Sequence, residues 1–329
     1  MVSIKDVANE AGVSTATVSR VLSNKPYVTA EARERVMAAI QKLGYRPNQI
    51  ARSLRSQQTT ALGLIVSDVC NPFFTDVSRS VEDCAYKEGY SVFLCNSDED
   101  DKKELFYLQQ MLDKNVAGII LSPTQKTADN FALLGIDLPV VLFDRSVDGL
   151  DVDSIIIDNQ DAAYQLAKHL IDNGYKRIAG VFCDVCTGFD RQAGFEKAVK
   201  DAGYEAPQLI VTQPRIERGY IAAKKLLSVS PRPDAIFASD SLVLSGVMQA
   251  INESGLKVPD DIGLASFDDV AWMSLVTPPI TVIRQPTDQI ARMAVDLIMQ
   301  RIENPKQPAL HVALKGQLIV RGSTKTRPG

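Results

Sequence analysis

The sequence has few of the residues on which catalysis and metal binding usually depend. Its 329 residues include two histidines and five cysteines, and it has no GxxxxGK or GxGxxG phosphate loop and no nucleophile elbow. A zinc site needs four ligands, and neither His169 nor His311 stands at ligand spacing from Cys183 and Cys186. We therefore expect no enzyme activity, no metal and no cofactor, and we interpret these two cysteines as small buried apolar residues.

The chain also lacks a signal peptide and any apolar run long enough to span a membrane. An odd number of scattered cysteines fits a reducing compartment. A composition of 45% hydrophobic and 23% charged residues is typical of a globular protein, and the length suggests two or three domains. We therefore expect a cytoplasmic protein with no membrane partner.

Charge is distributed unevenly along the chain. The whole sequence carries a net charge of -4, yet residues 1–58 hold nine Lys and Arg against four Asp and Glu, and residues 59–329 hold 27 against 36. A basic head on an acidic body is typical of a protein that brings one end to a polyanion. The distribution therefore indicates nucleic acid as a partner of the N-terminal part.

Residues 1–46 are expected to form a domain of three short helices. Ser14 and Thr29 are typical N-cap residues for the second and third helices, and Gly12 suits the left-handed position that ends the first. Two short helices joined by a tight glycine-containing turn indicate a helix-turn-helix, whose second helix can enter a DNA major groove. That helix, Thr15–Leu22, has short polar or cationic side chains on one side and no acidic residue, as binding to phosphates requires.

Residues 47–60 fit neither the helical segment before them nor the core that follows. Pro47 disfavours a helical conformation for the residue before it, and Asn48 is a plausible N-cap for a helix over residues 49–55. So short a helix is not stable in isolation. The segment is therefore either a plain linker or a helix that folds only where another molecule supplies contacts.

From Ala61 onward, short apolar runs alternate with helical patterns, and this alternation predicts parallel sheets with helices on both faces. Ten strands are too many for one such sheet, and the pattern runs twice. We therefore predict an α/β fold with two lobes of doubly wound parallel sheets. Strands are expected near 61–67, 90–95, 117–121, 138–143, 154–157, 177–183, 208–212, 234–238, 262–267 and 280–284.

The two lobes are expected to share the chain in separate pieces. The first would comprise residues 61–158 with about 286–304, and the second residues 159–285 with about 305–323. Residues 324–329 would form a polar tail. No leucine heptad stands there to build a tetramer, so a homodimer is the default expectation.

Polar side chains follow many of the expected strands, and ligands of open parallel sheets bind beyond the carboxyl ends of strands. Carboxylates, guanidinium groups and amides beside an aromatic pair suit a small polyol. The alternative is that Asp, Asn and Ser at these ends only cap the following helices, a role that Arg145 and Arg191 cannot fill. The polar or aromatic residues at strand ends are Asp68, Asn71, Phe73, Phe74, Ser122, Thr124, Asp144, Arg145, Asp190, Arg191, Asp240, Asp268 and Gln285.

Four motifs in the N-terminal part resemble the headpiece signature of the LacI/GalR family of bacterial repressors. The resemblance implies that Thr15, Ala16 and Arg20 face base edges, with Arg20 able to donate to guanine O6 and N7. It implies that Ser14, Thr17 and Ser19 lie nearer the DNA backbone. The motifs are IKDVA at 4–8, AGVS at 11–14, TVSRVL at 17–22 and YRPN at 45–48.

In the same family, the segment after Pro47 is a hinge helix that orders on operator DNA and wedges a leucine into the minor groove. The resemblance implies that Asn48 starts this helix, that Leu54 enters the groove, and that Arg52 and Arg55 are free to meet phosphates. Ala16 stands where many members carry a larger polar side chain, so the bases that are read stay open.

The core resembles the sugar-binding core that this family shares with ribose-binding-type periplasmic proteins, through NPFF at 71–74, FDR at 143–145 and QP at 285–286. Asp240 stands where an amide is usual. A carboxylate in place of an amide changes the hydrogen-bond polarity at one ligand hydroxyl, so ribose as the effector stays open. Purine-responsive members share the paired aromatics. The expected effector contacts are Asn71, Phe73, Phe74, Ser122, Asp144, Arg145, Arg191, Asp240, Phe267, Asp268 and Gln285.

Together these patterns predict a DNA-binding transcriptional repressor of a carbohydrate-related operon. It would bind a palindromic operator as a dimer and respond to a monosaccharide-like effector between the lobes, as inducer or as corepressor. A purine-responsive or global catabolite regulator of the same family is the nearest alternative. A sugar-binding protein would leave the basic head unexplained, and an enzyme would need cleft carboxylates to act as acid and base, although binding explains them equally well.

Overall fold

The computed structural model describes residues 2–22, 27–45 and 59–326, and the chain divides into two units, Met1–Thr59 and Thr60–Gly329. The expected linker helix lies outside the described residues, and so do four residues expected to contact DNA. These four are Asn48, Arg52, Leu54 and Arg55.

The described residues of the first unit form a small helical domain. Thr29 Oγ1 accepts a hydrogen bond from Ala32 N at 3.3 Å, and Ser14 Oγ accepts one from Thr17 N at 3.1 Å. Gly12 ends the first helix with φ at +62°. These three predicted helix ends are confirmed. The helices are α1 (Ile4–Ala11), α2 (Thr15–Leu22) and α3 (Ala30–Leu43), and their shared core comprises Val7, Ala8, Ala11, Val18, Val21, Val36 and Ala39.

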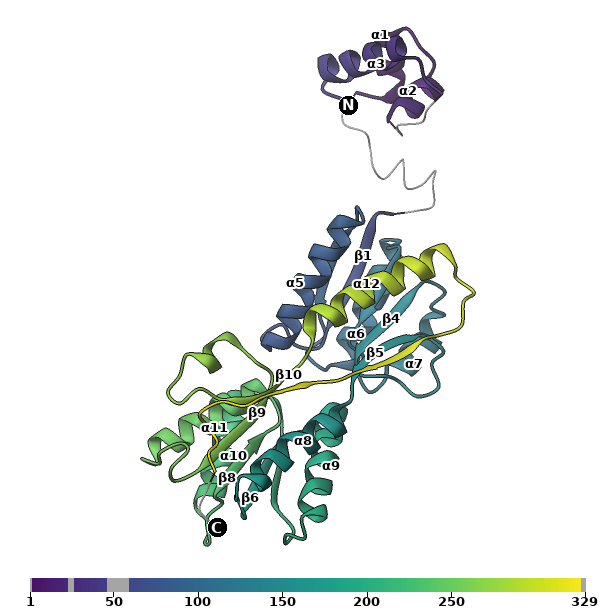
Figure 1. Cartoon of the computed structure of the whole chain (residues 1–329). Helices are drawn as coiled ribbons and strands as arrows, with labels where there is room; N and C mark the ends of the chain where they lie inside the picture. Colours follow the sequence, from purple (N-terminus) through teal and green to yellow (C-terminus); the bar gives the residue numbers. More distant parts are fainter. Residues whose placement is uncertain (1, 23–26, 46–58, 327–329) are drawn as a thin grey trace. The chain divides into compact units, whose positions relative to one another are not determined.

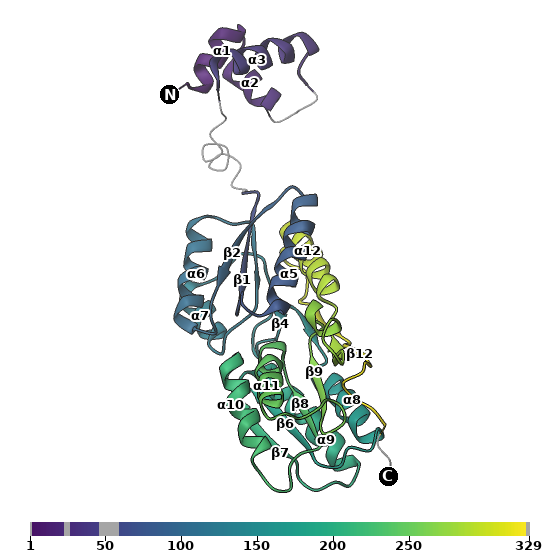
Figure 2. The same cartoon turned by 90° about the vertical axis from the view of Figure 1, so that its left-hand side faces the viewer.

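The second unit has two lobes, each built on a six-stranded sheet with helices on both faces (Figures 1 and 2). In the first lobe the strand order is β11-β5-β4-β3-β1-β2, and all its neighbouring strands run parallel. Its strands are β1 (Ala61–Val66), β2 (Ser91–Asn96), β3 (Gly118–Leu121), β4 (Val140–Asp144), β5 (Asp153–Ile157) and β11 (His311–Leu314), and its helices are α5 (Pro72–Lys87), α6 (Asp101–Asp113), α7 (Thr127–Leu134) and α12 (Thr287–Glu303).

In the second lobe the strand order is β12-β10-β9-β8-β6-β7, and only the β10–β12 pair is antiparallel. Its strands are β6 (Ile178–Cys183), β7 (Gln208–Thr212), β8 (Ala235–Ala238), β9 (Gly263–Phe267), β10 (Thr281–Arg284) and β12 (Gln317–Ile319), and its helical segments are α8 (Asn159–Asp172), α9 (Cys186–Asp201), α10 (Ile216–Leu227), α11 (Ser241–Glu253) and the short 3₁₀ turn η1 (Ala271–Ser274).

Each sheet separates two apolar clusters. In the first lobe, α5 and α12 pack on one face and α6 and α7 on the other. In the second lobe, α10 and α11 cover one face and α8 and α9 the other. Central strands are buried along their whole length because both faces are covered, as in β4, β6 and β9. The predicted pair of doubly wound lobes is confirmed.

One segment lies in a different lobe from the one expected. The sequence predicts residues 305–323 in the second lobe, and β12 does pair there with β10, but β11 pairs in parallel with β5 of the first lobe, with His311 opposite Ser154. The chain therefore passes between the lobes after β5, after β10 and again after β11. The yellow segment in Figure 1 shows the last of these passages. The short edge strand β11 alternates exposed and half-buried residues and carries too little apolar sequence to be recognised alone.

The expected polar tail also begins later than predicted. Thr324 is buried, and its hydroxyl lies 2.8 Å from His169 Nε2 and 2.9 Å from Thr281 Oγ1. Ser323 Oγ accepts from Thr281 N at 2.8 Å, so these hydroxyls satisfy the polar groups at the edge of the second sheet. No helix in the part of the chain that the structure describes has the length and apolar character needed to cross a membrane.

Candidate functional site

A cavity of about 420 Å³ lies at the carboxyl ends of the strands of both lobes in the second unit. This volume falls in the usual range for small-molecule sites, about 300 to 1,000 Å³. Its lining comes from the carboxyl ends of β1, β2, β3, β4, β6, β7, β8, β9 and β10 and the segments that follow them. A molecule in this cavity would contact both lobes together.

The structure gathers most, but not all, of the residues expected to bind an effector. Ser122 does not line the cavity, because its hydroxyl is buried 2.8 Å from Ser67 Oγ. Phe267 is also fully buried, and it acts on the cavity through Arg191, whose guanidinium lies over its ring at 4.0 Å. The residues that do line it are Asn71, Phe73, Phe74, Asp144, Arg145, Arg191, Asp240, Asp268 and Gln285.

The sequence interpretation missed several lining residues. Asp98 and Glu99 follow β2, and Arg215 follows β7, so the same strand-end rule would have found them had it been applied to these two edge strands. Asp184 and Thr187 lie between β6 and the first turn of α9. That helix begins at Cys186, so Arg191 reaches the cavity from within a helix, whereas Asp190 is exposed and does not line the cavity.

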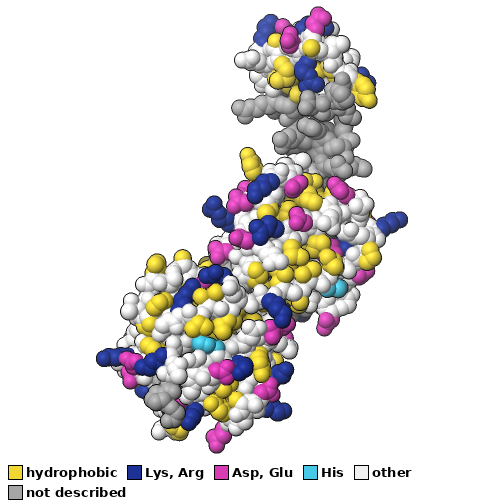
Figure 3. Space-filling view, viewed as in Figure 1, with side chains coloured by type: hydrophobic (Ala, Val, Ile, Leu, Met, Phe, Trp, Pro, Cys, Tyr) yellow, Lys and Arg dark blue, Asp and Glu magenta, His cyan; other side chains and the backbone are white. Residues whose placement is uncertain are grey.

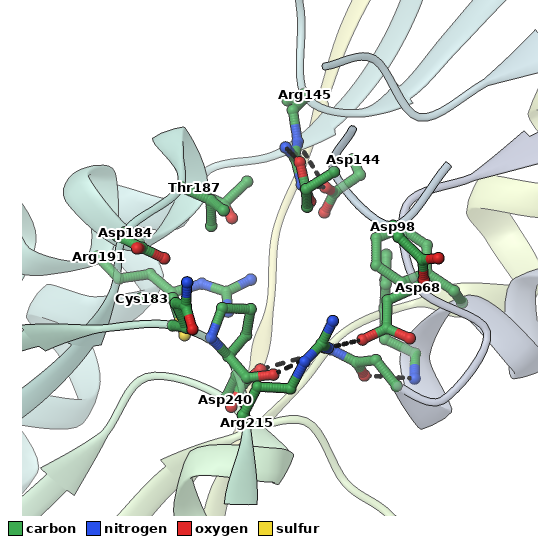
Figure 4. A pocket seen from close by; sticks show the side chains of 18 of the residues that line it. Asp68, Asp98, Asp144, Arg145, Cys183, Asp184, Thr187, Arg191, Arg215 and Asp240 are labelled. Atoms are coloured by element: carbon green, nitrogen blue, oxygen red, sulfur yellow. Dashed lines mark hydrogen bonds and ion pairs between the residues drawn. The ribbon is translucent and has the colours of Figure 1, made fainter. Parts of the chain in front are cut away.

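Arg145 is held by two carboxylates. Its Nη1 and Nη2 donate to the two oxygens of Glu99, each at 2.9 Å, and its Nε donates to Asp144 Oδ2 at 3.0 Å. Figure 4 shows Arg145 and Asp144 side by side at the edge of the cavity. Burial alone would lower the pKa of Arg145, but Asp144 and Glu99 outweigh it and raise this pKa above its ordinary value. The cation is therefore neutralised before any ligand arrives.

Arg191 is arranged differently. Its Nε donates to Asn159 Oδ1 at 2.8 Å and its Nη1 to the carbonyl oxygen of Ser239 at 2.7 Å. It is 6% exposed and lies over the ring of Phe267, yet it forms no ion pair with any residue that the structure describes. Its neutral partners and the ring fix its orientation and leave a positive charge for a ligand oxygen.

Asn71 and Asp240 meet across the two lobes, and each also caps a helix. Asn71 Oδ1 accepts from Phe73 N at 3.0 Å and Asp240 Oδ1 accepts from Val243 N at 2.7 Å. Asn71 Nδ2 donates to Asp240 Oδ2 at 3.5 Å. Capping and cavity lining are therefore compatible roles for one side chain, because each role uses a different atom.

Two further contacts shape the cavity. Arg215 of the second lobe pairs with Asp68 of the first, a second polar link between the lobes that Figure 4 marks. Gln285 Nε2 donates to Asp268 Oδ1 at 2.7 Å, whereas its Oε1 is buried without a hydrogen-bond partner among the described residues. An unpaired buried acceptor is costly, so a ligand donor at this position would be favourable.

Backbone strain is concentrated at this cavity. Five described residues other than glycine have positive φ, and four of them line it, namely Asp98, Glu99, Asp144 and Asp268. Such residues cost energy that a glycine would avoid, so they are retained where the side chain is needed. Here each of the four contributes a carboxylate to the lining.

Asp240 gives the protein a pH dependence that can be measured. Burial, together with the nearby carboxylate of Asp268, raises its pKa to about 6, against an ordinary 3.8, although the Val243 N–H opposes this. Because the folded pKa lies above the unfolded one, the folded state loses stability relative to the unfolded state as pH rises from about 4 to 6.

We expect Asp240→Asn, which keeps the helix cap, to raise the free energy of unfolding at pH 7.5. The gain over the unsubstituted protein should be about 1 kcal/mol larger at pH 7.5 than at pH 5. Urea unfolding at the two pH values checks this. An equal difference at both would show that Asp240 keeps an ordinary pKa.

The two cysteines near the cavity differ in exposure. Cys183 is buried and accepts a hydrogen bond from Ser239 Oγ at 3.3 Å, and burial raises the pKa of its thiol. Cys186 is exposed at the start of α9, so the expectation that both are buried is wrong. The reason is that Cys186 lies beyond the end of β6, at the first residue of α9.

In the first unit, α2 presents a polar surface. Val18 and Val21 are buried against α1 and α3, which turns the rest of the helix outward. Thr15, Ala16 and Arg20 are exposed. Ser14 is exposed as well, while Thr17 and Ser19 are half-buried. The helix can therefore offer the expected base-reading and backbone-contacting side chains to a groove.

Known protein families match both units. The model described as "Bacterial regulatory proteins, lacI family" matches residues 3–48, and that described as "Periplasmic binding protein-like domain" matches residues 167–324. An "HTH-type transcriptional repressor PurR" from Pasteurella multocida is 34% identical over 99% of this chain and 100% of its own. A "Ribose operon repressor" from Halalkalibacterium halodurans is 35% identical over 99% of this chain and 98% of its own.

Solved structures agree with these sequence relatives. The Lac repressor dimer bound to operator and an anti-inducer superposes with a TM-score of 0.88 at 26% identity, covering 98% of this chain and 99% of that one. A putative ribose operon repressor from Burkholderia thailandensis gives 0.72 at 31% identity, covering 80% of this chain and 99% of that one. The proteins named here are transcriptional repressors, and none is named as an enzyme.

Proposed function

Since this chain belongs to the LacI family of bacterial regulatory proteins and is a DNA-binding transcriptional repressor, we propose that it controls a carbohydrate-related operon in response to a monosaccharide-like effector. Two chains would pair through their second units and read the halves of a palindromic operator in the cytoplasm. The observation that carries the effector proposal is a cavity lined by hydrogen-bonding groups from both lobes.

The effector would act by changing how the lobes are held. Two polar contacts, Asn71 with Asp240 and Arg215 with Asp68, join the lobes at the cavity. A ligand that replaces or reinforces these contacts changes the lobe arrangement, and the spacing of the two DNA-binding units in a dimer with it. Such coupling between sites is typically about 1 to 3 kcal/mol.

Several side chains support a polyhydroxylated ligand. Asp144 and Asp268 supply acceptors, Arg191 supplies charged donors, and Gln285 Oε1 is an acceptor without a partner in the described structure. Hydroxyl groups donate and accept, so they match a lining of both kinds. Phe73 and Phe74 lie with their ring centroids 5.0 Å apart and offer apolar area for the C–H face of a sugar.

A nucleobase is the second candidate, because a planar ligand can stack on one of these two rings, which stand at 74° to each other. Its edge would then meet the amide and carboxylate groups of the lining. The two candidates differ in their need for aromatic surface and for many separate hydroxyl contacts.

A two-part experiment tests the proposal. A thermal-shift screen of pentoses, hexoses and purine bases identifies ligands, since a ligand of the folded state raises the unfolding temperature. Titration of a selected palindromic DNA with and without the best ligand then measures the coupling. If no sugar shifts either measurement while a purine shifts both, the carbohydrate assignment is wrong and the nucleobase candidate replaces it.

For DNA recognition, we expect Arg20→Ala to weaken binding to the selected palindrome by about 1 to 3 kcal/mol and to relax base preference at one position of each half-site. The exposed Arg35 of α3 supplies the control, because Arg35→Ala removes the same charge from another helix. Fluorescence anisotropy on the palindrome and its single-base variants checks this. If both variants lose the same affinity for the palindrome and for all its single-base variants, Arg20 contacts phosphate and does not read a base.

A further inference from the structure

The cavity holds far more negative than positive groups. Among the described residues, eight carboxylates and three guanidinium groups line it. On the face shown in Figure 3, by contrast, acidic and basic side chains are interspersed over the second unit. The acidic residues of the lining are Asp68, Asp98, Glu99, Asp101, Asp144, Asp184, Asp240 and Asp268.

Ion pairs do not remove this excess. Arg145 pairs with Glu99 and Asp144, Arg215 with Asp68, and Lys103 reaches Asp98 from outside the lining. Four lining carboxylates form no ion pair with any residue that the structure describes. Arg191 is the remaining cation, so an anionic ligand would meet several like charges for each opposite one. The four carboxylates are Asp101, Asp184, Asp240 and Asp268.

Glu99 decides how much positive charge the cavity offers. Both of its oxygens accept from Arg145 at 2.9 Å, so the guanidinium fork faces a carboxylate that belongs to the protein. An arginine free of such a partner would bind a phosphate or carboxylate through the same two donors. Glu99 occupies the place that an acidic ligand would take.

The backbone at Glu99 also indicates that this carboxylate is required. Asp98 and Glu99 have φ of +53° and +57°, in the left-handed region that glycine, asparagine and aspartate enter more readily than a glutamate does. Two consecutive residues are held there at a cost that glycine would remove. The gain from the side chain must offset that cost, and the Arg145 pairing is the contact that Glu99 makes.

We propose that the cavity selects a polyhydroxylated effector without negative charge, and that Glu99 sets this selectivity by occupying the guanidinium of Arg145. The inference rests on the proposed sugar effector and deepens it. Sugar acids and sugar phosphates are then excluded by electrostatics, even where their ring hydroxyls fit.

Binding of matched sugars tests the first half of the inference. Ribose with ribose 5-phosphate, and glucose with glucuronate and glucose 6-phosphate, keep the sugar ring while adding negative charge. We expect the uncharged member that binds to exceed its anionic counterparts by about a hundredfold or more in affinity, measured by calorimetry. Tighter binding of any anionic member would overturn the inference while leaving a sugar-controlled repressor intact.

The variant Glu99→Gln tests the second half. Its amide carries no charge, so Arg145 keeps one carboxylate partner, Asp144, in place of two. We therefore expect the preference for the uncharged sugar over its phosphate to fall by about tenfold or more. Inorganic phosphate, a probe independent of the effector's identity, should raise the unfolding temperature of Glu99→Gln more than that of the unsubstituted protein. A circular dichroism spectrum and the unfolding temperature without ligand establish that the variant is folded.

A charge-matched control separates a local effect from one of total charge. Glu303 is exposed at the end of α12, away from the cavity lining, so Glu303→Gln removes one negative charge elsewhere in the same unit. This control should behave like the unsubstituted protein toward phosphate and toward the sugar pairs. If Glu99→Gln and Glu303→Gln respond alike to phosphate, Glu99 has no role in selectivity. If no member of either sugar series binds but phosphate still separates the two variants, the sugar effector fails and the role of Glu99 stands.

Discussion

Arg191→Ala is expected to weaken effector binding by about a hundredfold or more and to abolish the effector's influence on DNA binding. The variant removes a buried cation that is fixed by Asn159, the Ser239 carbonyl and the ring of Phe267. A hydrogen bond to a charged group contributes about 1.5 to 3 kcal/mol, so loss of two such bonds to a ligand accounts for this factor. Calorimetry with the effector found by screening measures the loss.

Two other variants make this result specific. Arg191→Lys keeps a positive charge without the planar fork, so we expect its affinity to lie between those of the alanine variant and the unsubstituted protein. Arg292→Ala removes an exposed arginine of α12 that does not line the cavity, and it should leave effector binding as it is. An unchanged ligand response in Arg191→Ala would show that the cavity has been assigned wrongly.

The second large effect concerns stability. Asp153 at the start of β5 is buried, and Arg301 in the last turn of α12 donates to it from Nε at 3.0 Å and from Nη2 at 2.8 Å. Leu310 N donates to the same carboxylate at 2.8 Å. This ion pair therefore holds the end of α12 and the segment that leads into β11 against the first sheet.

Arg301→Met leaves this buried carboxylate without its cation. We expect the free energy of unfolding to fall by about 3 to 5 kcal/mol, the usual cost of breaking a buried pair by removing one partner. Urea unfolding at pH 7 measures it. Arg292→Ala on the same helix should change stability by less than about 0.5 kcal/mol.

The double variant Asp153→Leu with Arg301→Met distinguishes a broken ion pair from a general loss of packing. Because no unpaired charge is left, its stability should exceed that of Arg301→Met alone, although Leu310 N still loses its acceptor. A double variant less stable than Arg301→Met would show that packing, and not charge, is what Arg301 supplies.

The strained carboxylates connect stability with function. Asp144 and Asp268 adopt positive φ at the ends of β4 and β9 and line the cavity from opposite lobes. The protein keeps a conformational cost at these positions, as binding sites often do. Asp240, with its raised pKa, adds an electrostatic cost in the same place. At the cavity, side chains that can bind a ligand are therefore kept although they lower the stability of the fold.

Much of the site followed from one rule about strand ends. Asn71, Asp144, Asp240 and Asp268 were found because a parallel sheet directs all its carboxyl ends to one edge. That rule depends only on where strands end, which apolar runs reveal locally. It cannot tell whether a residue at a strand end faces the cavity or the protein interior, and Ser122 was misassigned for this reason.

The sequence by itself determined the helix ends of the first unit, the alternation of strands and helices, and the two-lobed class of the core. These features depend on capping residues and on side-chain periodicity over a few neighbouring positions. Only the tertiary structure decided that β11 pairs with β5, that Phe267 supports Arg191, and that Glu99 neutralises Arg145. Each of these pairs joins residues more than 40 positions apart, so the choice of partner depends on the path of the whole chain.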